Sequence, residues 1–346
     1  MNLIPNKRFL RFNDWWHFKV AHLLGFAYFV IFLADLSLLE SSKILGIYLV
    51  GVFGIAATGY IINDYYDREI DLKAGKSNSL SIYKGVHVAI IIVLLQVIAL
   101  VPWLLLEVTV HIWILISLQY IMYFLYSYPL TRWKEKGLYG VLADSLYGHA
   151  IPALVTILAL PQSVMSPIHS DVIFIATLFF WQVFKGARNI ILHQLVDRKI
   201  DEALQVKTFA VQRKGLYALN LVNRVILPVE ILLLISITWL ISLQIESYYV
   251  GLVVFAVWTF FKFSGWRLFT IPHRQLKFKF LFFLNDYYED WMPVIFLFFL
   301  IQKDLDFIFL LVAHLILFRK AILKLLSDIV LIIKNTFSRE KCGDLG

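Results

Sequence analysis

Oxygen-bearing side chains recur at intervals of four residues near one end of a long apolar stretch. Asn63, Asp67 and Asp71 form this first column, and Asp64 stands beside them. On a helix, residues four apart share one face, so these side chains would project together. So many oxygens repel one another unless a cation lies among them. The spacing therefore predicts a cation site.

A second column follows in the same four-residue steps, and it also ends in two carboxylates. Its members are Lys185, Asn189, His193, Asp197 and Asp201. Magnesium prefers hard oxygen ligands, usually one or two carboxylates together with water and substrate phosphate. Two DxxxD columns that face each other would suit this need. The alternative for either column alone is a solvated helix end with ordinary surface cations as partners.

The chain that must position these columns is strongly apolar. Of its 346 residues, 60% are hydrophobic and only 16% are charged, and the mean hydropathy is +0.76. These values lie outside the range of ordinary soluble domains. The only cysteine, Cys342, lies in the C-terminal tail, which excludes a disulfide framework and a thiolate metal site.

Apolar stretches long enough to cross a hydrocarbon core of about 30 Å recur along the whole length. We expect an all-α fold, a polytopic transmembrane bundle of about nine or ten helices around a central cavity. The two motif helices would face each other across that cavity, which would open to the cytoplasmic side. The expected spans are residues 20–39, 44–62, 86–106, 110–127, 138–160, 172–190, 216–242, 248–262, 280–301 and 306–326.

The distribution of cations among the polar gaps predicts the orientation. The net charge is +8, but Lys and Arg are spread over alternate gaps instead of forming one patch, which argues against a nucleic-acid partner. The opposite gaps hold only Lys43 and Lys303. Because cytoplasmic loops are enriched in Lys and Arg, we expect the N-terminus in the cytoplasm. A bacterial inner membrane is the default location.

We expect residues 1–346 to form a single transmembrane domain. Residues 1–19 would be a cytoplasmic N-terminal segment, and residues from about 303 to 346 an extra helix and tail. The carboxylates concentrate in the gaps 63–85 and 185–214, which continue the helical pattern of the preceding spans. Chemistry is therefore expected at the cytoplasmic face.

These motifs resemble those of the UbiA superfamily of intramembrane prenyltransferases. The family's first motif, NDxxDxxxD, is matched at every position from Asn63 to Asp71, and its second, DxxxD, at Asp197 and Asp201. Thr208 follows where the family often has Ser or Thr. The order of the motifs agrees with the family, and the similarity covers about residues 15–300.

The segment between the two motifs also resembles the family, whereas two positions depart from it. Residues 126–134 look like the family's segment that contains tyrosine and proline and ends in basic residues. Asn78-Ser79 stands where members commonly carry an Arg-Pro pair, and Gln205 stands where a glycine is often found. These departures leave the subgroup within the superfamily open.

The resemblance implies a Mg²⁺-dependent enzyme that transfers a prenyl group from an isoprenoid diphosphate to a lipophilic acceptor, which can be aromatic. Membrane lipid surrounds it, and no protein partner is predicted. The implied catalytic residues are Asp67, Asp71, Asp197 and Asp201. The implied metal ligands are these four with Asn63 and Asp64. The implied diphosphate-binding residues are Asn63, Lys73, Lys76, Arg132, Asn189 and Lys207, with Arg188 as a further candidate cation. For any single cation the alternative is an ordinary charge of a cytoplasmic loop.

Three polar residues of the fifth span are candidates for the acceptor side. A carboxylate or imidazole at Asp144 or His149, with Tyr147 nearby, could take a proton from the attacking nucleophile. Alternatively, Asp144 pairs structurally with a loop cation. Residues 285–290 look like a weak echo of the first motif, and we interpret them as an internal polar contact, with a substrate contact as the alternative.

Two rival functions remain open. A terpene cyclase on the same scaffold would quench its carbocation internally and need no acceptor. A membrane transporter would use its carboxylates to bind a cation or a proton. The position of the carboxylates at one face, and not at the midplane, argues against the transporter.

Overall fold

The computed structural model describes residues 12–73, 85–160, 171–265 and 281–343, and also residues 10, 75, 78, 80 and 83. Every described element is a helix, and the described residues contain no strand, which confirms the all-α prediction. The chain divides into two compact units, Met1–Ile237 and Thr238–Gly346.

The first unit carries both motifs. Its elements are α1 (Phe12–Trp15), η1 (Trp16–Val20), α2 (Ala21–Ala34), α3 (Leu38–Lys73), α4 (Gly85–Leu105), α5 (Val110–Ser127), η2 (Trp133–Glu135), α6 (Leu138–Ser145), η3 (Leu146–Ala150), α7 (Ile151–Ala159), α8 (Val172–Ala203), α9 (Phe209–Gln212), α10 (Gly215–Leu221) and η5 (Val222–Ile226). The next helix, α11 (Leu227–Ser242), begins in this unit and ends in the second.

Helix α3 begins at a capping box and runs well beyond the length of a membrane span. The Ser37 hydroxyl and backbone N–H donate to Glu40 Oε2 at 2.6 and 3.1 Å, which satisfies polar groups at the helix start. The helix has 36 residues, or about 54 Å at 1.5 Å per residue. Because a hydrocarbon core is about 30 Å thick, its last turns, which carry the first motif, can extend into the headgroup region.

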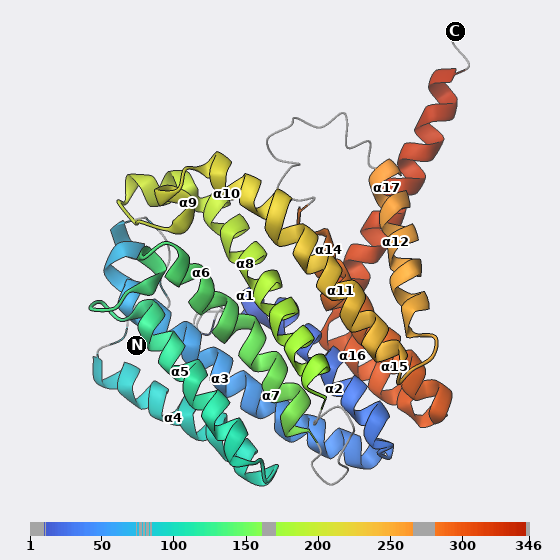
Figure 1. Cartoon of the computed structure of the whole chain (residues 1–346), viewed down its shortest axis with the longest axis horizontal. Coiled ribbons are helices and arrows are strands. Elements are labelled where there is room, and N and C mark those ends of the chain that lie inside the picture. The colour runs from blue at the N-terminus through green and yellow to red at the C-terminus, as the bar shows by residue number, and fades with distance from the viewer. Residues whose placement is uncertain are drawn as a thin grey trace. The chain divides into compact units, whose positions relative to one another are not determined.

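Helices α3 and α4 lie side by side (Figure 1) and approach each other closely at Gly54. A Cβ atom built on Gly54 would lie 2.5 Å from the backbone nitrogen and Cα of Ala99. Glycine therefore permits backbone contact here, as small residues do between membrane helices.

A buried ion pair joins α8 to α11. Arg188 donates from Nε to Glu230 Oε2 at 2.6 Å and from Nη2 to Oε1 at 2.8 Å, and both side chains are fully buried. This paired geometry satisfies both charges away from water.

The second unit contains α12 (Tyr248–Gly265), α14 (Phe283–Asp286), η6 (Tyr287–Trp291), α15 (Met292–Lys303), η7 (Leu305–Phe307), α16 (Ile308–Leu317) and α17 (Arg319–Gly343). The single span expected over residues 306–326 is divided at Phe318, whose N–H donates to the carbonyl of His314.

Six helical stretches of the described chain are long and apolar enough to cross a membrane. They are Trp16–Ala34, Leu38–Lys73, Gly85–Leu105, Val110–Ser127, Leu138–Ala159 and Gly215–Ser242. The protein is therefore an integral multi-pass membrane protein, as the sequence predicted. The total of nine or ten spans stays a prediction.

Candidate functional site

The first motif lies on the last turns of α3, with its residues on one continuous helix as predicted. Asp64 is buried, whereas Asn63, Asp67 and Asp71 are partly exposed. Ser127, at the end of α5, donates from its hydroxyl to Asn63 Oδ1 at 3.3 Å. The end of α5 therefore contacts the start of the motif.

Asn78 fixes the far end of this column. Its Nδ2 donates to Asp71 Oδ2 at 2.8 Å and to the backbone carbonyl of Asp64 at 2.7 Å, and its Oδ1 accepts from the Leu80 N–H at 3.0 Å. The side chain is buried. Sequence analysis noted Asn78 only as a departure from the family, because an isolated amide has no periodic spacing that would indicate its partners.

Two cations from the loop after α5 reach Asp67. Lys134 donates from Nζ to Asp67 Oδ1, and Arg132 donates from Nη2 to the same oxygen at 3.3 Å. Arg132 also pairs with Glu135. Its backbone has φ 35° and ψ 55°, a left-handed conformation that is unfavourable for a residue with a side chain. Arg132 is thus one predicted diphosphate ligand that the fold brings to the motif.

Lys134 contacts the first motif, although sequence analysis did not single it out. It was noticed only as part of the basic end of residues 126–134. Burial lowers the pKa of its ammonium group, an effect that the neighbouring Asp67 carboxylate opposes. Its side chain is 12% exposed, so the ammonium group is largely shielded from water beside this carboxylate.

The second motif lies on the last turns of α8, also as predicted. Asp201 Oδ2 accepts from the Thr208 hydroxyl at 3.3 Å, while Asp197 is exposed. His193, one turn before Asp197, interacts electrostatically with it and with Asp144. Gln205, in the turn after α8, has a left-handed φ of 57°, which explains why a glycine suits this position.

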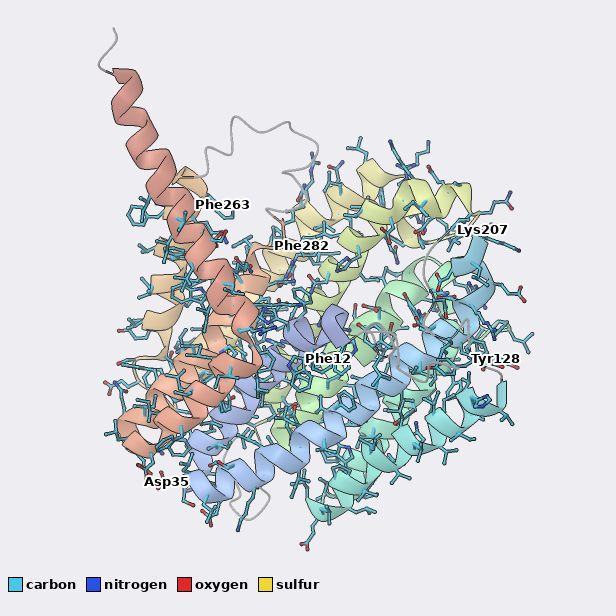
Figure 2. All side chains as sticks on the ribbon, turned by 180° about the vertical axis from the view of Figure 1, so that it is seen from behind. Phe12, Asp35, Tyr128, Lys207, Phe263 and Phe282 are labelled. Atoms are coloured by element: carbon cyan, nitrogen blue, oxygen red, sulfur yellow. The ribbon has the colours of Figure 1, made fainter. Side chains whose placement is uncertain are left out.

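Gln212 joins the two motif loops. Its Nε2 donates to the backbone carbonyl of Glu135 at 2.7 Å and to that of Lys207 at 2.6 Å. Glu135 belongs to the loop whose cations bind Asp67, and Lys207 to the loop that follows Asp201. Figure 2 shows Lys207 and Tyr128 toward one end of the first unit and Asp35 toward the other. Both motifs therefore belong to one polar end of this unit.

A tyrosine and a carboxylate lie beside this polar end. Tyr147 donates from its hydroxyl to Asp144 Oδ1 at 2.8 Å, and the rings of Tyr147 and Tyr126 are 5.3 Å apart between centroids. The carboxylates of Asp144, Asp67 and Asp201 lie close enough to Tyr126 to disfavour ionisation of its hydroxyl. Tyr126 therefore lies in the neighbourhood of the acceptor-side candidates and of both columns.

Tyr147 and His149 lie in a segment where the helix geometry changes. Residues Leu146–Ala150 form a π-helical turn between α6 and α7, a feature that is frequent at functional sites. Gln119 donates to the carbonyl of Tyr147 at 2.9 Å and so supports this turn. His149 interacts electrostatically with Lys19 and several other cations.

The remaining candidates have different environments. Lys73 is exposed at the last residue of α3, Lys207 is exposed, and Asn189 is buried in α8. Arg188 forms a buried ion pair with Glu230, so its side chain joins two helices. Lys76 lies outside the described residues.

The donor set has the chemistry that Mg²⁺ prefers. The two columns offer carboxylate and amide oxygens, and Mg²⁺ commonly takes one or two carboxylates and fills its remaining positions with water and substrate phosphate. Within the described part of the chain, no three His, Cys, Asp or Glu side chains form a ready metal-binding group. The oxygens of the two columns fit the ligand preference of Mg²⁺.

Comparison with known proteins agrees with this geometry. The sequence profile described as the UbiA prenyltransferase family matches residues 23–286. The chain belongs to this family. No curated protein matches the sequence.

Solved structures share the fold of this UbiA family member. A UbiA homolog from Archaeoglobus fulgidus bound to GPP and Mg²⁺ is 15% identical, with a TM-score of 0.55 over 84% of this chain and 98% of that chain. The same homolog bound to DMAPP and Mg²⁺ gives 0.56 over the same shares. A digeranylgeranylglyceryl phosphate synthase is 16% identical, with a TM-score of 0.51 over 83% of this chain and 94% of that chain.

Proposed function

We propose that this prenyltransferase-family protein uses Mg²⁺ to transfer a prenyl group from an isoprenoid diphosphate to a lipophilic acceptor, aromatic acceptors included. One observation carries the proposal. Gln212 donates hydrogen bonds to two loops. One loop carries Lys134 and Arg132, which contact Asp67, and the other loop follows Asp201. Two carboxylate motifs and two cations thus belong to one network. The GPP, DMAPP and Mg²⁺ bound in the structural neighbours support this reading.

The carboxylates of Asp67, Asp71, Asp197 and Asp201, with Asn63 and Asp64, would hold the metal. Bound Mg²⁺ would neutralise negative charge on the leaving diphosphate. Asn78 holds the Asp71 carboxylate in place through its 2.8 Å hydrogen bond.

Cations of the chain would bind the diphosphate itself. Lys134 and Arg132 would turn from Asp67 to the phosphate oxygens, with Lys73, Lys76, Asn189 and Lys207 as further ligands. The allylic C–O bond would then break, and its electron pair would leave with the diphosphate. Charge-assisted hydrogen bonds to an oxyanion are the strong ones, so two adjacent cations favour this leaving group.

The tyrosines beside the polar end would face the resulting carbocation. The aromatic rings of Tyr126 and Tyr147 can stabilise positive charge and help to exclude water. The acceptor nucleophile would form a bond to the prenyl carbon and release a proton to Asp144 or His149. Asp144 Oδ1 accepts a hydrogen bond from the Tyr147 hydroxyl at 2.8 Å, so its carboxylate is oriented toward this region.

The proposed setting is a bacterial inner membrane with the N-terminus in the cytoplasm. Cations in alternate gaps support this orientation. The diphosphate would then arrive from the cytoplasm and the prenyl chain would lie in the bilayer.

Product analysis tests transfer against cyclisation. Purified protein would be incubated with allylic diphosphates of increasing length and Mg²⁺, with or without a membrane lipid extract as acceptor source. Transfer predicts a prenylated product that forms only with the extract. A cyclic terpene formed without the extract would identify a cyclase instead.

A matched pair of variants tests the acceptor side in the same assay. Tyr147→Phe should reduce prenylated product while diphosphate release persists, because only the hydroxyl that orients Asp144 is lost. Tyr139→Phe, at an exposed tyrosine of α6, should leave both unchanged. If Tyr147→Phe and the wild-type protein form equal amounts of prenylated product, the Tyr147 hydroxyl has no role on the acceptor side.

A further inference from the structure

The C-terminal helices α16 and α17 meet at a bend centred on Phe318. The Phe318 N–H donates to the carbonyl of His314 at 2.9 Å, and the Ala321 N–H donates to the carbonyl of Phe318 at 2.9 Å. The side chains of Phe318 and His314 are buried, and their ring centroids are 4.7 Å apart. These contacts stabilise the bend, which lies beyond the family match over residues 23–286.

A groove of about 440 Å³ lies along this bend. Its apolar lining consists of Val312, Leu315 and Ile316 from α16 and Ile322 from α17. Arg319, the first residue of α17, is the charged member of the lining. We call these five residues the bend groove. Because Ile316 is 68% exposed, the groove is open to the surroundings of the helices, where a hydrocarbon chain could enter it.

Arg319 follows an apolar stretch that is too short to cross a bilayer. The stretch Leu305–Leu317 extends over about 20 Å at 1.5 Å per residue, whereas the hydrocarbon core is about 30 Å thick. A helix that starts at one headgroup region would therefore carry Arg319 to hydrocarbon depth. An arginine there is costly unless it meets an anion or extends its side chain to the headgroups.

The protein supplies little negative charge near Arg319. Among the residues that the structure describes, the Arg319 side chain has no ion pair, and α17 has no acidic residue in its first turn. The adjacent Lys320 is exposed. Because the N-terminal end of a helix carries partial positive charge, two cations at this end are unfavourable until an anion neutralises them.

Phosphate is the anion that suits a guanidinium group best in a membrane. Arginine can donate two parallel N–H hydrogen bonds to phosphate oxygens, and the apolar lining of the bend groove suits a hydrocarbon chain. A phosphate joined to hydrocarbon chains describes a phospholipid. A lipid with net negative charge fits better than a zwitterionic one, because the ammonium group of a zwitterion would be repelled by Arg319 and Lys320.

A second hollow adjoins the bend groove. This larger pocket, of about 740 Å³, lies between α12, α15 and α17 and shares Leu315 and Ile322 with the bend groove. Its lysine, Lys324, is ion-paired with Asp286 at 2.5 Å, and most of its lining is apolar. The two hollows together offer room for the two hydrocarbon chains of one lipid.

We propose that the bend groove binds an anionic phospholipid of the surrounding membrane. The phosphate oxygens accept hydrogen bonds from the Arg319 guanidinium, and one hydrocarbon chain lies against Val312, Ile316 and Ile322. The site belongs to the second unit alone, so the inference does not depend on the proposed enzymatic activity.

Native mass spectrometry of the full-length protein in mild detergent tests the proposal. Phosphatidylglycerol and phosphatidylcholine with identical acyl chains would be added in equal amounts. Phosphatidylglycerol should be retained about tenfold more than phosphatidylcholine. Equal retention of the two lipids would indicate annular lipid only, and a preference for phosphatidylcholine would indicate a site for a cation. Either outcome overturns the proposal.

A matched pair of charge variants locates the headgroup. Arg319→Gln and Lys320→Gln remove the same charge from adjacent exposed residues, but Arg319 lines the bend groove and Lys320 does not. Arg319→Gln should reduce the preference for phosphatidylglycerol about tenfold, whereas Lys320→Gln should keep most of it. An equal loss in both variants would mean that the lipid responds to the general charge of α17, which contradicts a site at Arg319.

A second pair of variants locates the hydrocarbon chain. Ile316 lines the bend groove and Leu317 does not, although their side chains are 68% and 47% exposed. Ile316→Trp should fill the groove and reduce retained phosphatidylglycerol about tenfold, whereas Leu317→Trp should retain it. Equal retention by these two variants would place the chain elsewhere. If Ile316→Trp does not fold, the pair at residues 319 and 320 still decides the proposal.

Discussion

Asp67 is the residue at which distant parts of the sequence meet. Lys134 and Arg132 reach it from the loop after α5, and neither lies near it in sequence. A hydrogen bond to a charged group contributes about 1.5–3 kcal/mol. The two cations therefore restrain the carboxylate, and they supply positive charge where a diphosphate would bind.

Lys134→Met should lower kcat/KM for the allylic diphosphate by about 10- to 100-fold, the equivalent of one charged hydrogen bond. Lys136→Met in the same loop is the control, because Lys136 is exposed. Steady-state diphosphate release measures both. Equal values for the two variants would show that Lys134 does not bind substrate.

Gln205 should tolerate glycine better than any branched residue. Its φ of 57° costs an ordinary residue roughly 1–2 kcal/mol, which glycine avoids. We expect Gln205→Gly to be at least as stable as the wild-type protein and Gln205→Val to be less stable by about 1 kcal/mol. Thermal unfolding in detergent measures this order, and a Gly variant less stable than the Val variant would contradict it.

Among individual residues, the sequence predicted those that recur at regular four-residue intervals. The columns of Asn63, Asp67 and Asp71 and of Asp197 and Asp201 lie on helices, as their four-residue steps required. Lys134, Asn78 and Gln212, which contact the motifs or their loops, were not singled out. Lys134 lies 67 residues from Asp67 and Gln212 lies 77 residues from Glu135, so only the folded loops bring these pairs together. Asn78 lies 7 residues from Asp71, but an isolated amide has no periodic spacing that would mark it.

Close packing and buried charge hold the elements that carry these residues. Helix α3 contacts α4 through Gly54, and α8 is joined to α11 through Arg188 and Glu230. Both contacts lie on helices whose ends carry a motif. Disturbing either contact should therefore destabilise the first unit and displace a motif.

Gly54→Ala should destabilise the protein by about 1–3 kcal/mol, since its Cβ would overlap the α4 backbone. Gly46→Ala on the same helix is the control, because nothing lies within 4 Å of a Cβ built there. That change should be neutral or stabilising by up to about 1 kcal/mol. Thermal unfolding compares them, and equal effects would contradict the close approach at Gly54.

Glu230→Gln should destabilise the first unit strongly. It would leave the fully buried Arg188 guanidinium without its counter-charge, at a cost of about 3–5 kcal/mol. The exposed Glu246→Gln should change stability by less than about 0.5 kcal/mol. A Glu230 variant as stable as the wild-type protein would show that the ion pair does not hold α8 to α11.

Element positions were predictable because membrane helices must be long and apolar. The expected spans 110–127 and 138–160 nearly coincide with Val110–Ser127 and Leu138–Ala159. The division at Phe318 and the π-helical turn at Leu146–Ala150 were not anticipated. Hydropathy reports the environment of a segment but does not register a local change in hydrogen-bond pattern.

The whole molecule is a multi-pass membrane protein with two compact units. The first unit holds both carboxylate motifs. The second holds a pocket lined by residues of α12, α15 and α17.

Diphosphate release by the purified full-length protein, with Mg²⁺ or with EDTA, tests most directly whether the two motifs form one ionising site. We predict Mg²⁺-dependent release that falls by at least about 100-fold in both Asp67→Asn and Asp201→Asn. It should persist in Glu69→Gln, at an exposed carboxylate of the same helix. Release that continues in EDTA, or that survives either aspartate substitution, would contradict a shared metal-dependent site.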